Sequence, residues 1–304
     1  MSYILSAATP PPLIIHLDSR FASQYLENDA NGRPLSTNYI YVMREPVVVP
    51  EHMNLLISLH TATIPYSFYN VRTGVNDKVY YTSAGSDGDI TLTHGNYSAT
   101  GLITELKTKL EAEIGGGFSI STTYSRETIK FTYTVTGVAS FVFKFSNTTA
   151  SAADLLGFYD GEDTAMTIGV GTLSEKAIDL NDSIHGLYIR QNIATKGTLD
   201  NEQGTFSNIL ARLPISTNAG GIIFYSPSDN DHETMVSAPL IQTIGVKLTD
   251  DRNRAIDLNG LHWQMSFKIS YIHKETLREP PPRRYRPQNE ELKIKSRTKQ
   301  RQKK

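Results

Sequence analysis

The stretch HWQMSFKISYI, residues 262–272, alternates apolar side chains with small or charged ones. Successive side chains of a β-strand point to opposite faces of a sheet, so this pattern predicts a strand with one face in a core and the other in solvent. Strands of this kind are typical of antiparallel sheets. The side chains expected on the buried face are Met265, Phe267, Ile269 and Tyr271.

Other strand-like runs lie on both sides of the middle of the chain. LIIHLDS (13–19), NYIYVM (38–43) and NLLISLHTATI (54–64) come before it, and five or six more runs follow Ile184. A total of eight or nine antiparallel strands predicts a mainly β protein built as a single jelly roll, which is an antiparallel β-sandwich. We expect LIIHLDS to be buried, and we expect His16 and His60 to be hydrogen-bonded core histidines because they lie in apolar runs.

The middle of the chain has a different pattern. Ser98 is a suitable N-cap for a helix whose apolar residues recur at helical spacing until Gly115. TIKFTYTV (128–135) then alternates with a period of two, which predicts a strand. The side chains expected on the buried face of that strand are Ile129, Phe131, Tyr133 and Val135. A helix on a few antiparallel strands makes a compact α+β unit inside the β chain.

These patterns predict a jelly roll that is interrupted in sequence by the α+β unit. The inserted unit would be a small domain with its own core. The expected parts are a flexible N-terminal arm at 1–12, a discontinuous jelly-roll domain at 13–72 and 165–275, the inserted α+β domain at 73–164, and a basic tail at 276–304.

The formal net charge of −1 hides a separation of charge along the chain. Eleven Lys or Arg and three Glu between Arg278 and Lys304 give that segment a net charge of +8, which leaves −9 on residues 1–277. A cationic, Pro-rich segment is typical of a disordered arm that binds DNA or an acidic protein surface, and it also suits a solubilising end or a nuclear-localisation signal. The candidate contacts to DNA or to a protein partner are Arg283, Arg284, Arg286, Lys293, Lys295, Arg297, Lys299, Arg301, Lys303 and Lys304.

The sequence carries no signature of catalysis. A P-loop, a dinucleotide fingerprint, a His-Glu-x-x-His motif and a nucleophile elbow are all missing. SDNDHE (228–233) lacks the ligand order and the glycine of an EF-hand, and Ser226, Asp229 and His232 are crowded into one loop, where residues rarely reach the geometry of a catalytic triad. We therefore expect no catalytic residue, no cofactor, no metal site and no enzyme activity.

Composition also predicts where the protein works. The chain has no cysteine, which rules out disulfides and thiolate chemistry and suits a reducing compartment. No run approaches the roughly 18 consecutive apolar residues of a membrane span, and the first residues lack the cationic start of a signal peptide. We expect a soluble intracellular product without a membrane span.

Several passages resemble the minor capsid and penton proteins of virophages and related double-stranded DNA viruses. The resemblance is clearest in ISLHTATIPYSFYNV (57–71). The two strands expected before this segment carry LDSR (17–20) and STNYIYVM (36–43). With its length, jelly-roll pattern and insertion, the chain resembles most closely the penton proteins of Mavirus-like virophages. The other similar passages are HGNYSATGLITELKTKL (94–110), YSRETIKFTYT (124–134) and SAADLLGF (151–158).

The resemblance implies a structural capsid protein of the virion, assembled in the host cytoplasm. Its partners would be four further copies in a homopentamer at each fivefold vertex of an icosahedral particle, and the major capsid protein. The insertion would project outward. The basic tail would face inward, against packaged DNA or the major capsid protein.

Two alternatives come from the residues themselves. A β-sandwich binding module that recognises a glycan or a host surface would use exposed aromatic side chains, for which the candidates are Tyr66, Phe68, Tyr69 and Tyr97. These side chains also suit a core or a subunit interface. A nucleic-acid-binding protein outside any capsid would concentrate its affinity in the last 27 residues.

Overall fold

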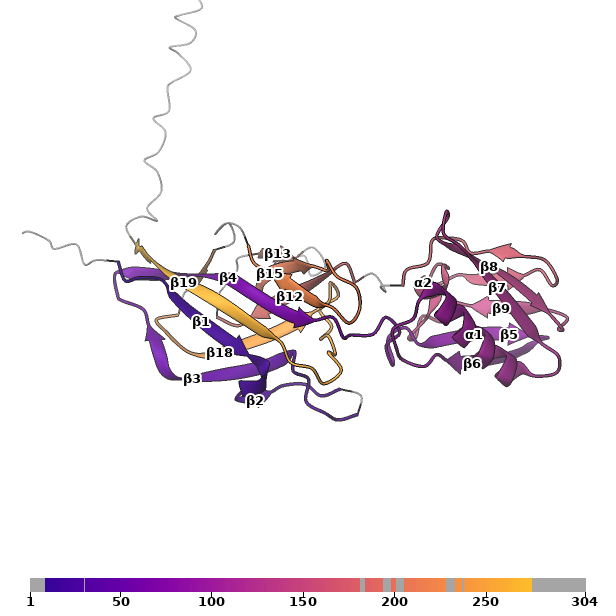
Figure 1. The fold of residues 1–304 in the computed structure, drawn as a ribbon, viewed down its shortest axis with the longest axis horizontal. Coiled ribbons are helices and arrows are strands. Elements are labelled where there is room, and N and C mark those ends of the chain that lie inside the picture. Colours follow the sequence, from indigo (N-terminus) through magenta and orange to yellow (C-terminus); the bar gives the residue numbers. More distant parts are fainter. Residues whose placement is uncertain are drawn as a thin grey trace, which may run out of the picture.

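The computed structural model describes residues 9–29, 31–180, 184–193, 198–200, 205–227, 233–236 and 238–274. They form two lobes, one beyond the other along the long axis of the molecule, which are called here the sandwich lobe and the insert lobe (Figure 1). The expected basic tail with its ten candidate contacts, and the expected arm up to residue 8, lie outside the described residues.

The sandwich lobe contains two antiparallel sheets. The first sheet runs in the order β1 (Leu13–Asp18), β19 (Gln264–His273), β4 (Met53–Pro65) and β16 (Ile222–Tyr225), and β17 (Thr234–Val236) also pairs with β4. The second sheet runs in the order β15 (Ile209–Pro214), β12 (Gly186–Gln191), β18 (Leu240–Thr249), β3 (Asn38–Val48) and β2 (Gln24–Tyr25). A separate hairpin pairs β13 (Thr198–Asp200) with β14 (Thr205–Ser207).

The order of the strands is that of a jelly roll. Strands β16 and β17 pair with two successive parts of β4, so together they act as one interrupted strand. Taken in chain order, the first sheet then holds the first, eighth, third and sixth principal strands, and the second sheet holds the fifth, fourth, seventh and second. The chain thus alternates between the two sheets as in a pair of Greek keys. The fold class predicted from the sequence is confirmed.

The last strand forms as the alternation predicts. Met265, Phe267 and Ile269 of β19 are at most 2% exposed, and they face the apolar residues of β4 and of the second sheet. Trp263, just before β19, is 1% exposed and lies edge-on to Tyr39 of β3. These side chains close one end of the sandwich core.

Strand β1 differs from the prediction. It is an edge strand, and within it only Leu17 is fully buried, while His16 is exposed. His60 is exposed as well, so the prediction of two core histidines is wrong. The physical reason is that His16 points to the outer face of the sheet, where its Nδ1 makes a 2.8 Å hydrogen bond with the Ser266 hydroxyl. A continuous apolar run does not reveal that a strand lies at an edge.

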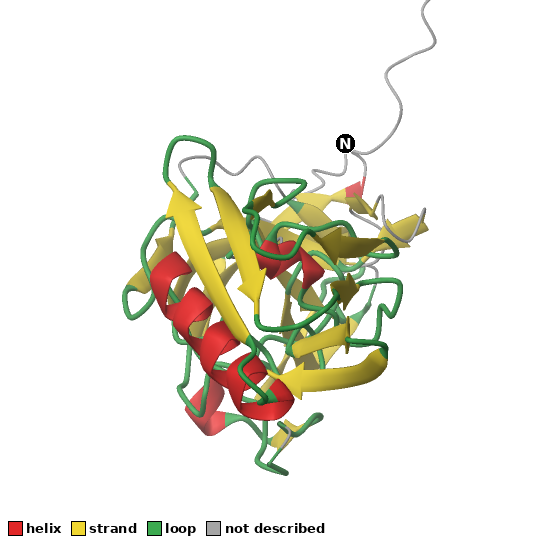
Figure 2. Cartoon of the chain, turned by 90° about the vertical axis from the view of Figure 1, so that its right-hand side faces the viewer, coloured by secondary structure: helices red, strands yellow, loops and turns green. Residues whose placement is uncertain are grey.

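The insert lobe holds a second hydrophobic core. One sheet has the order β10 (Asp163–Met166), β9 (Phe141–Lys144), β5 (Lys78–Ser83) and β6 (Ser86–Thr91), and another has the order β11 (Thr172–Leu173), β8 (Lys130–Thr136) and β7 (Ser119–Ser125). Helix α1 (Ala99–Ile114) covers these strands and buries its apolar stripe against them (Figure 2). The Ser98 side chain caps α1, as predicted, by accepting a 3.1 Å hydrogen bond from the backbone N–H of Gly101. The short helix α2 (Ala153–Leu156) ends at Gly157 in the left-handed region.

Two details of the insert lobe differ from the sequence prediction. Ile129 is 48% exposed and has a φ of 56°, because it lies in the turn between β7 and β8 and not on the buried face of β8. Strands β10 and β11 pair with β9 and β8, and Leu180 still packs against the core of this lobe, so the lobe extends past residue 164.

Candidate interaction surface

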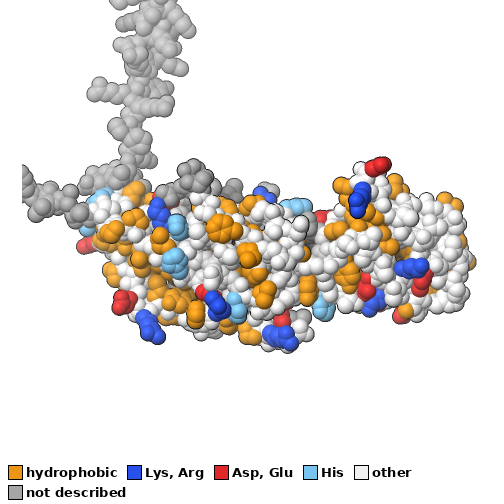
Figure 3. All heavy atoms as spheres, viewed as in Figure 1, with side chains coloured by type: hydrophobic (Ala, Val, Ile, Leu, Met, Phe, Trp, Pro, Cys, Tyr) orange, Lys and Arg blue, Asp and Glu red, His pale blue; other side chains and the backbone are white. Residues whose placement is uncertain are grey.

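Large apolar side chains reach the solvent along two opposite edges of the first sheet. The first flank follows β1 and the segment after it, and the second flank follows β16 and β17. Phe21 on the first flank is 70% exposed, and Ile222 and Phe224 on the second are each 63% exposed. Figure 3 shows hydrophobic side chains over the sandwich lobe in the view in which this sheet faces the reader. The first flank is Leu13, Ile14, Phe21 and Leu26, and the second flank is Ile222, Phe224 and Met235.

The outer face of the sheet between the two flanks is polar. The Ser266 hydroxyl on β19 accepts a 3.0 Å hydrogen bond from the Thr61 hydroxyl and is also bonded to His16. An edge strand with exposed apolar side chains and unpaired backbone groups is a site of association unless it is covered. The surface is therefore apolar at its two edges and carries hydrogen-bonded polar side chains between them.

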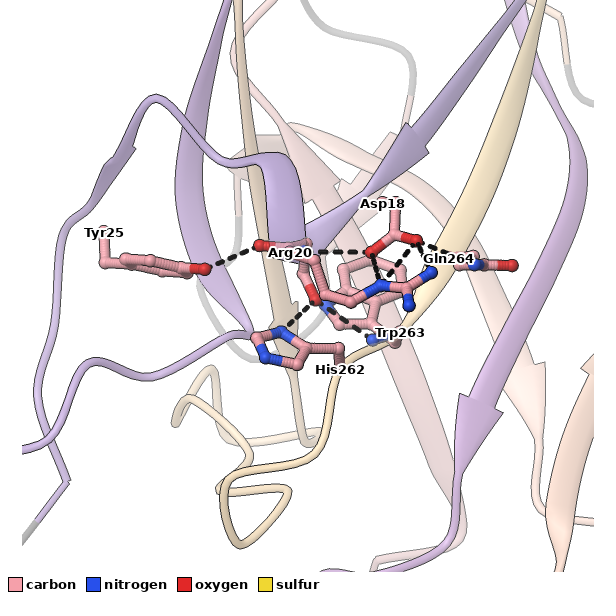
Figure 4. Close-up of polar contacts among 7 residues, drawn as sticks. Asp18, Arg20, Tyr25, His262, Trp263 and Gln264 are labelled. Atoms are coloured by element: carbon pink, nitrogen blue, oxygen red, sulfur yellow. Dashed lines mark hydrogen bonds and ion pairs between the residues drawn. The ribbon is translucent and has the colours of Figure 1, made fainter.

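A tight turn follows β1, between Ile14 and Phe21 of the first flank, and it carries the LDSR motif (Figure 4). The Asp18 carboxylate accepts hydrogen bonds from Nε of Arg20 at 3.0 Å, from the backbone N–H of Arg20 at 2.9 Å and from Nε2 of Gln264 at 2.7 Å. The Arg20 side chain is the main reason that the pKa of Asp18 lies well below its usual range, and burial opposes this shift only in part. The charged carboxylate thus ties the turn to the start of β19.

Ser19 completes this connection. Its hydroxyl oxygen accepts a 3.0 Å hydrogen bond from the backbone N–H of Trp263 and is bonded to Nδ1 of His262 at 3.1 Å. Its carbonyl accepts a 2.7 Å bond from the Tyr25 hydroxyl (Figure 4). An adjoining hollow of about 340 Å³ reaches from Asp18 to Ile222, and Leu261 and Trp263 also line it. The motif is structural because it fixes the end of the sheet between the two flanks.

We expect Asp18→Asn to lower the free energy of unfolding by about 1–2 kcal/mol at pH 7, because the variant loses charge-assisted hydrogen bonds. The lowered pKa means that the stabilisation is present above the unfolded-state value, near pH 4, and is lost as the pH falls through the folded-state pKa. Urea denaturation at neutral pH and in a series below about pH 4 measures both effects. Asp160→Asn is the control, because Asp160 is exposed. If Asp18→Asn lowered the free energy of unfolding by the same amount at every pH, the lowered pKa of Asp18 would be contradicted.

The passage between the lobes is held by side chains of the IPYSFYN motif. Asn70 donates a 2.8 Å hydrogen bond from Nδ2 to the Tyr97 carbonyl and accepts a 2.9 Å bond from the Tyr97 N–H. The Ser67 hydroxyl donates to the Leu258 carbonyl at 2.7 Å. Arg72 lies 3.5 Å from the fully buried carboxylate of Asp250, at the end of β18. These contacts connect residues of the insert lobe to the sandwich lobe.

A crevice of about 490 Å³ opens beside this passage. One wall comes from the insert lobe, another from the loop between β15 and β16, and the two chain crossings between the lobes form the rest. The residues that line it are Tyr66, Asn70, Asn96, Tyr97, Ser98, Leu180, Ile184, His185, Ile215, Thr217, Asn218 and Ala219.

The other candidates from the sequence are placed as follows. Of the four aromatic candidates, Phe68 is buried, whereas Tyr66, Tyr69 and Tyr97 are partly exposed. Asp229, Asp231 and His232 of the SDNDHE run lie outside the described residues. Within the described part of the chain, no group of three or more His, Asp or Glu could hold a metal ion, and no helix is long and apolar enough to cross a membrane.

Sequence reasoning missed the two flanks and the crevice. The run GGIIFYS marked a strand, but its alternation did not tell which of Ile222 and Ile223 would face the solvent. The crevice is assembled from four separate stretches of the chain, so no local pattern announces it.

The fold defines a jelly-roll β-sandwich that carries an inserted α+β lobe. No protein-family model matches the chain, and no curated protein matches it. The structure is similar to the crystal structure of the selenomethionine-labelled mavirus penton protein, with 11% sequence identity and a TM-score of 0.46. The match covers 86% of this chain and 100% of that chain.

Proposed function

We propose that this chain is a structural capsid protein and not an enzyme, and that five copies form a ring at each fivefold vertex of an icosahedral virus particle. The observation that carries the proposal is the pair of unlike apolar flanks on opposite edges of one sheet. A cyclic ring is closed by heterologous contacts, in which one flank of each subunit meets the other flank of the next. Such contacts require apolar surface at two different places on each subunit.

The number of copies and the capsid setting rest on the sequence motifs. The passages 57–71 and 94–110 resemble penton proteins, and their Asn70 and Tyr97 bond to each other where the lobes join. A penton is the vertex protein of an icosahedral shell, and the major capsid protein is then its neighbour. The protein would be located in the virion.

The proposal includes an orientation in the shell. The jelly-roll domain lies in the shell, the inserted domain projects outward, and the basic tail points inward. It is supported by the positions of the chain ends, because β1 starts and β19 ends at the end of the sandwich lobe far from the insert lobe (Figure 1). Thr9 and His273 are adjacent there, with 3.3 Å between Thr9 Oγ1 and His273 Nε2.

Native mass spectrometry of the purified chain tests the ring. Five copies of the 33.8 kDa chain give about 169 kDa, and we expect this mass for the full chain and for a chain that ends at Glu275, because the flanks lie outside the tail. A mass of 33.8 kDa for the full chain at low and at moderate ionic strength would contradict ring formation by the chain alone.

Removal of residues 276–304 tests the role of the tail. We expect the full chain to bind duplex DNA with an affinity that falls about a thousandfold between about 50 and 200 mM salt, because cationic residues release the counterions of the phosphates. The shortened chain, with its acidic body, should show no measurable binding. Fluorescence anisotropy with a labelled duplex measures both, and equal binding by the two chains would place the DNA contacts elsewhere.

A further inference from the structure

We propose that the interlobe crevice is a binding site for a neutral saccharide of one or two sugar residues, a function separate from ring formation. Its volume of about 490 Å³ lies within the roughly 300–1,000 Å³ of small-molecule sites. It is open to solvent and combines aromatic, amide and hydroxyl side chains.

The lining selects for a neutral, hydroxyl-rich ligand. Among the described residues that line the crevice, none is Asp, Glu, Lys or Arg. Asn96 and Asn218 offer amides that both donate and accept, and Thr217 offers a hydroxyl, so they match sugar hydroxyls, which also do both. A nucleic acid or a sulfated sugar would require cationic partners for its charges, and the described part of the lining supplies no Lys or Arg.

The wall on the insert side is fixed before any ligand arrives. Both polar groups of the Asn70 side chain bond to the backbone of Tyr97, and the backbone N–H of Asn70 donates a 3.0 Å hydrogen bond to Oδ1 of Asn96. The Tyr97 hydroxyl donates to the Thr93 carbonyl at 2.8 Å. The Asn96 amide is therefore held at its oxygen, and Asn96 is an exposed residue that lines the crevice. Such preorganisation reduces the entropy that binding costs.

The opposite wall is held in the same way. The Tyr66 ring stacks on the buried Phe68 with 4.3 Å between the ring centroids. Backbone hydrogen bonds from Tyr66 N to the Gly221 carbonyl (2.9 Å) and from Gly220 N to the Tyr66 carbonyl (2.8 Å) attach the loop of Thr217 and Asn218. A Cβ at Gly221 would lie 2.3 Å from Oγ1 of Thr217, so only glycine leaves that hydroxyl in its place. The crevice is thus lined by a rigid aromatic ring and a fixed polar loop.

Saturation-transfer NMR on the full chain tests the proposal. The probes are lactose, maltose, mannobiose and N,N′-diacetylchitobiose, with a sulfated heparin disaccharide and a blocked alanine dipeptide for comparison. We expect at least one neutral disaccharide to bind with a Kd of about 1 mM or tighter. The double variant Asn96→Ala, Asn218→Ala should weaken that binding about tenfold or more, since each change removes a hydrogen-bonding amide.

Asn147→Ala is the matched control, because Asn147 is also exposed but lies away from the crevice in the insert lobe. It should bind the sugar like the unaltered chain. Circular dichroism confirms that each variant is folded. Binding that survives the double variant, binding of only the sulfated sugar or the dipeptide, or no binding of any neutral probe would each overturn the proposal.

Discussion

Phe224→Asp is expected to convert the ring into monomers. Phe224 is 63% exposed on the second flank and faces away from the core, so its replacement should leave the fold of the subunit intact. In an assembled ring the aspartate would be buried without a partner at every contact. Loss of an aromatic side chain from the centre of an interface costs about 2–4 kcal/mol. That cost weakens each contact about 30- to 1,000-fold.

Native mass spectrometry of the variant should show mainly the 33.8 kDa chain under conditions where the unaltered chain forms the larger mass. Leu173→Asp is the matched control, because Leu173 is 52% exposed but lies on β11 of the insert lobe, away from both flanks. It should assemble normally. Assembly of the Phe224 variant with unchanged mass and concentration dependence would show that the second flank is not a subunit contact.

The same experiment on the first flank separates a ring from a twofold dimer. In a ring built from unlike contacts, Phe21→Asp and Phe224→Asp damage the two sides of one contact. Mixing the two variants therefore leaves each chain with one intact flank, and they should pair as a dimer that cannot extend. A twofold contact between like flanks would instead be lost in only one of the two variants.

The sequence predicted those features that a local period encodes. The alternation in β19 and the helical spacing before Gly115 both appear in the structure as read, because each places apolar residues on one side of a single element. The LDSR and IPYSFYN motifs were read as marks of a protein class. Their residues hold neighbouring segments together, since Asp18 and Ser19 fix β1 to β19, and Asn70 fixes the passage between the lobes to Tyr97 of the insert lobe.

What could not be predicted depends on which elements become neighbours. LIIHLDS has the apolar content of a central strand. In the structure it pairs with β19 and with no second strand of the sheet, so it is an edge strand, and Ile14 is exposed. Ile129 continues the alternation of β8 in sequence, but the chain turns at that residue. The crevice combines Tyr66, Asn96 and Asn218, which are far apart in the sequence. These facts belong to the tertiary structure and have no local signature.

Trp263→Ala is expected to have the largest effect on the stability of the sandwich lobe. Trp263 is 1% exposed, lies edge-on to Tyr39, and donates a 2.9 Å hydrogen bond from Nε1 to the Ser36 carbonyl. Removing a buried tryptophan costs about 3–5 kcal/mol, because it leaves a cavity and an unpaired carbonyl. Domains are stable by only about 5–15 kcal/mol, so the variant should be marginal.

Trp263 is the single tryptophan of the chain, so unfolding in urea must be followed by circular dichroism and not by tryptophan fluorescence. We expect the transition of the sandwich lobe to shift by about 1–3 M urea. Trp263→Phe should lose less stability, since it keeps most of the apolar volume and loses the Ser36 bond.

A second transition that stays unchanged would come from the insert lobe, whose separate core does not contain Trp263. If both cores unfold together at the lower urea concentration, then contacts between the lobes, such as that of Arg72 with Asp250, couple them into one folding unit. A transition within about 1 kcal/mol of the unaltered chain would contradict the packing described for Trp263.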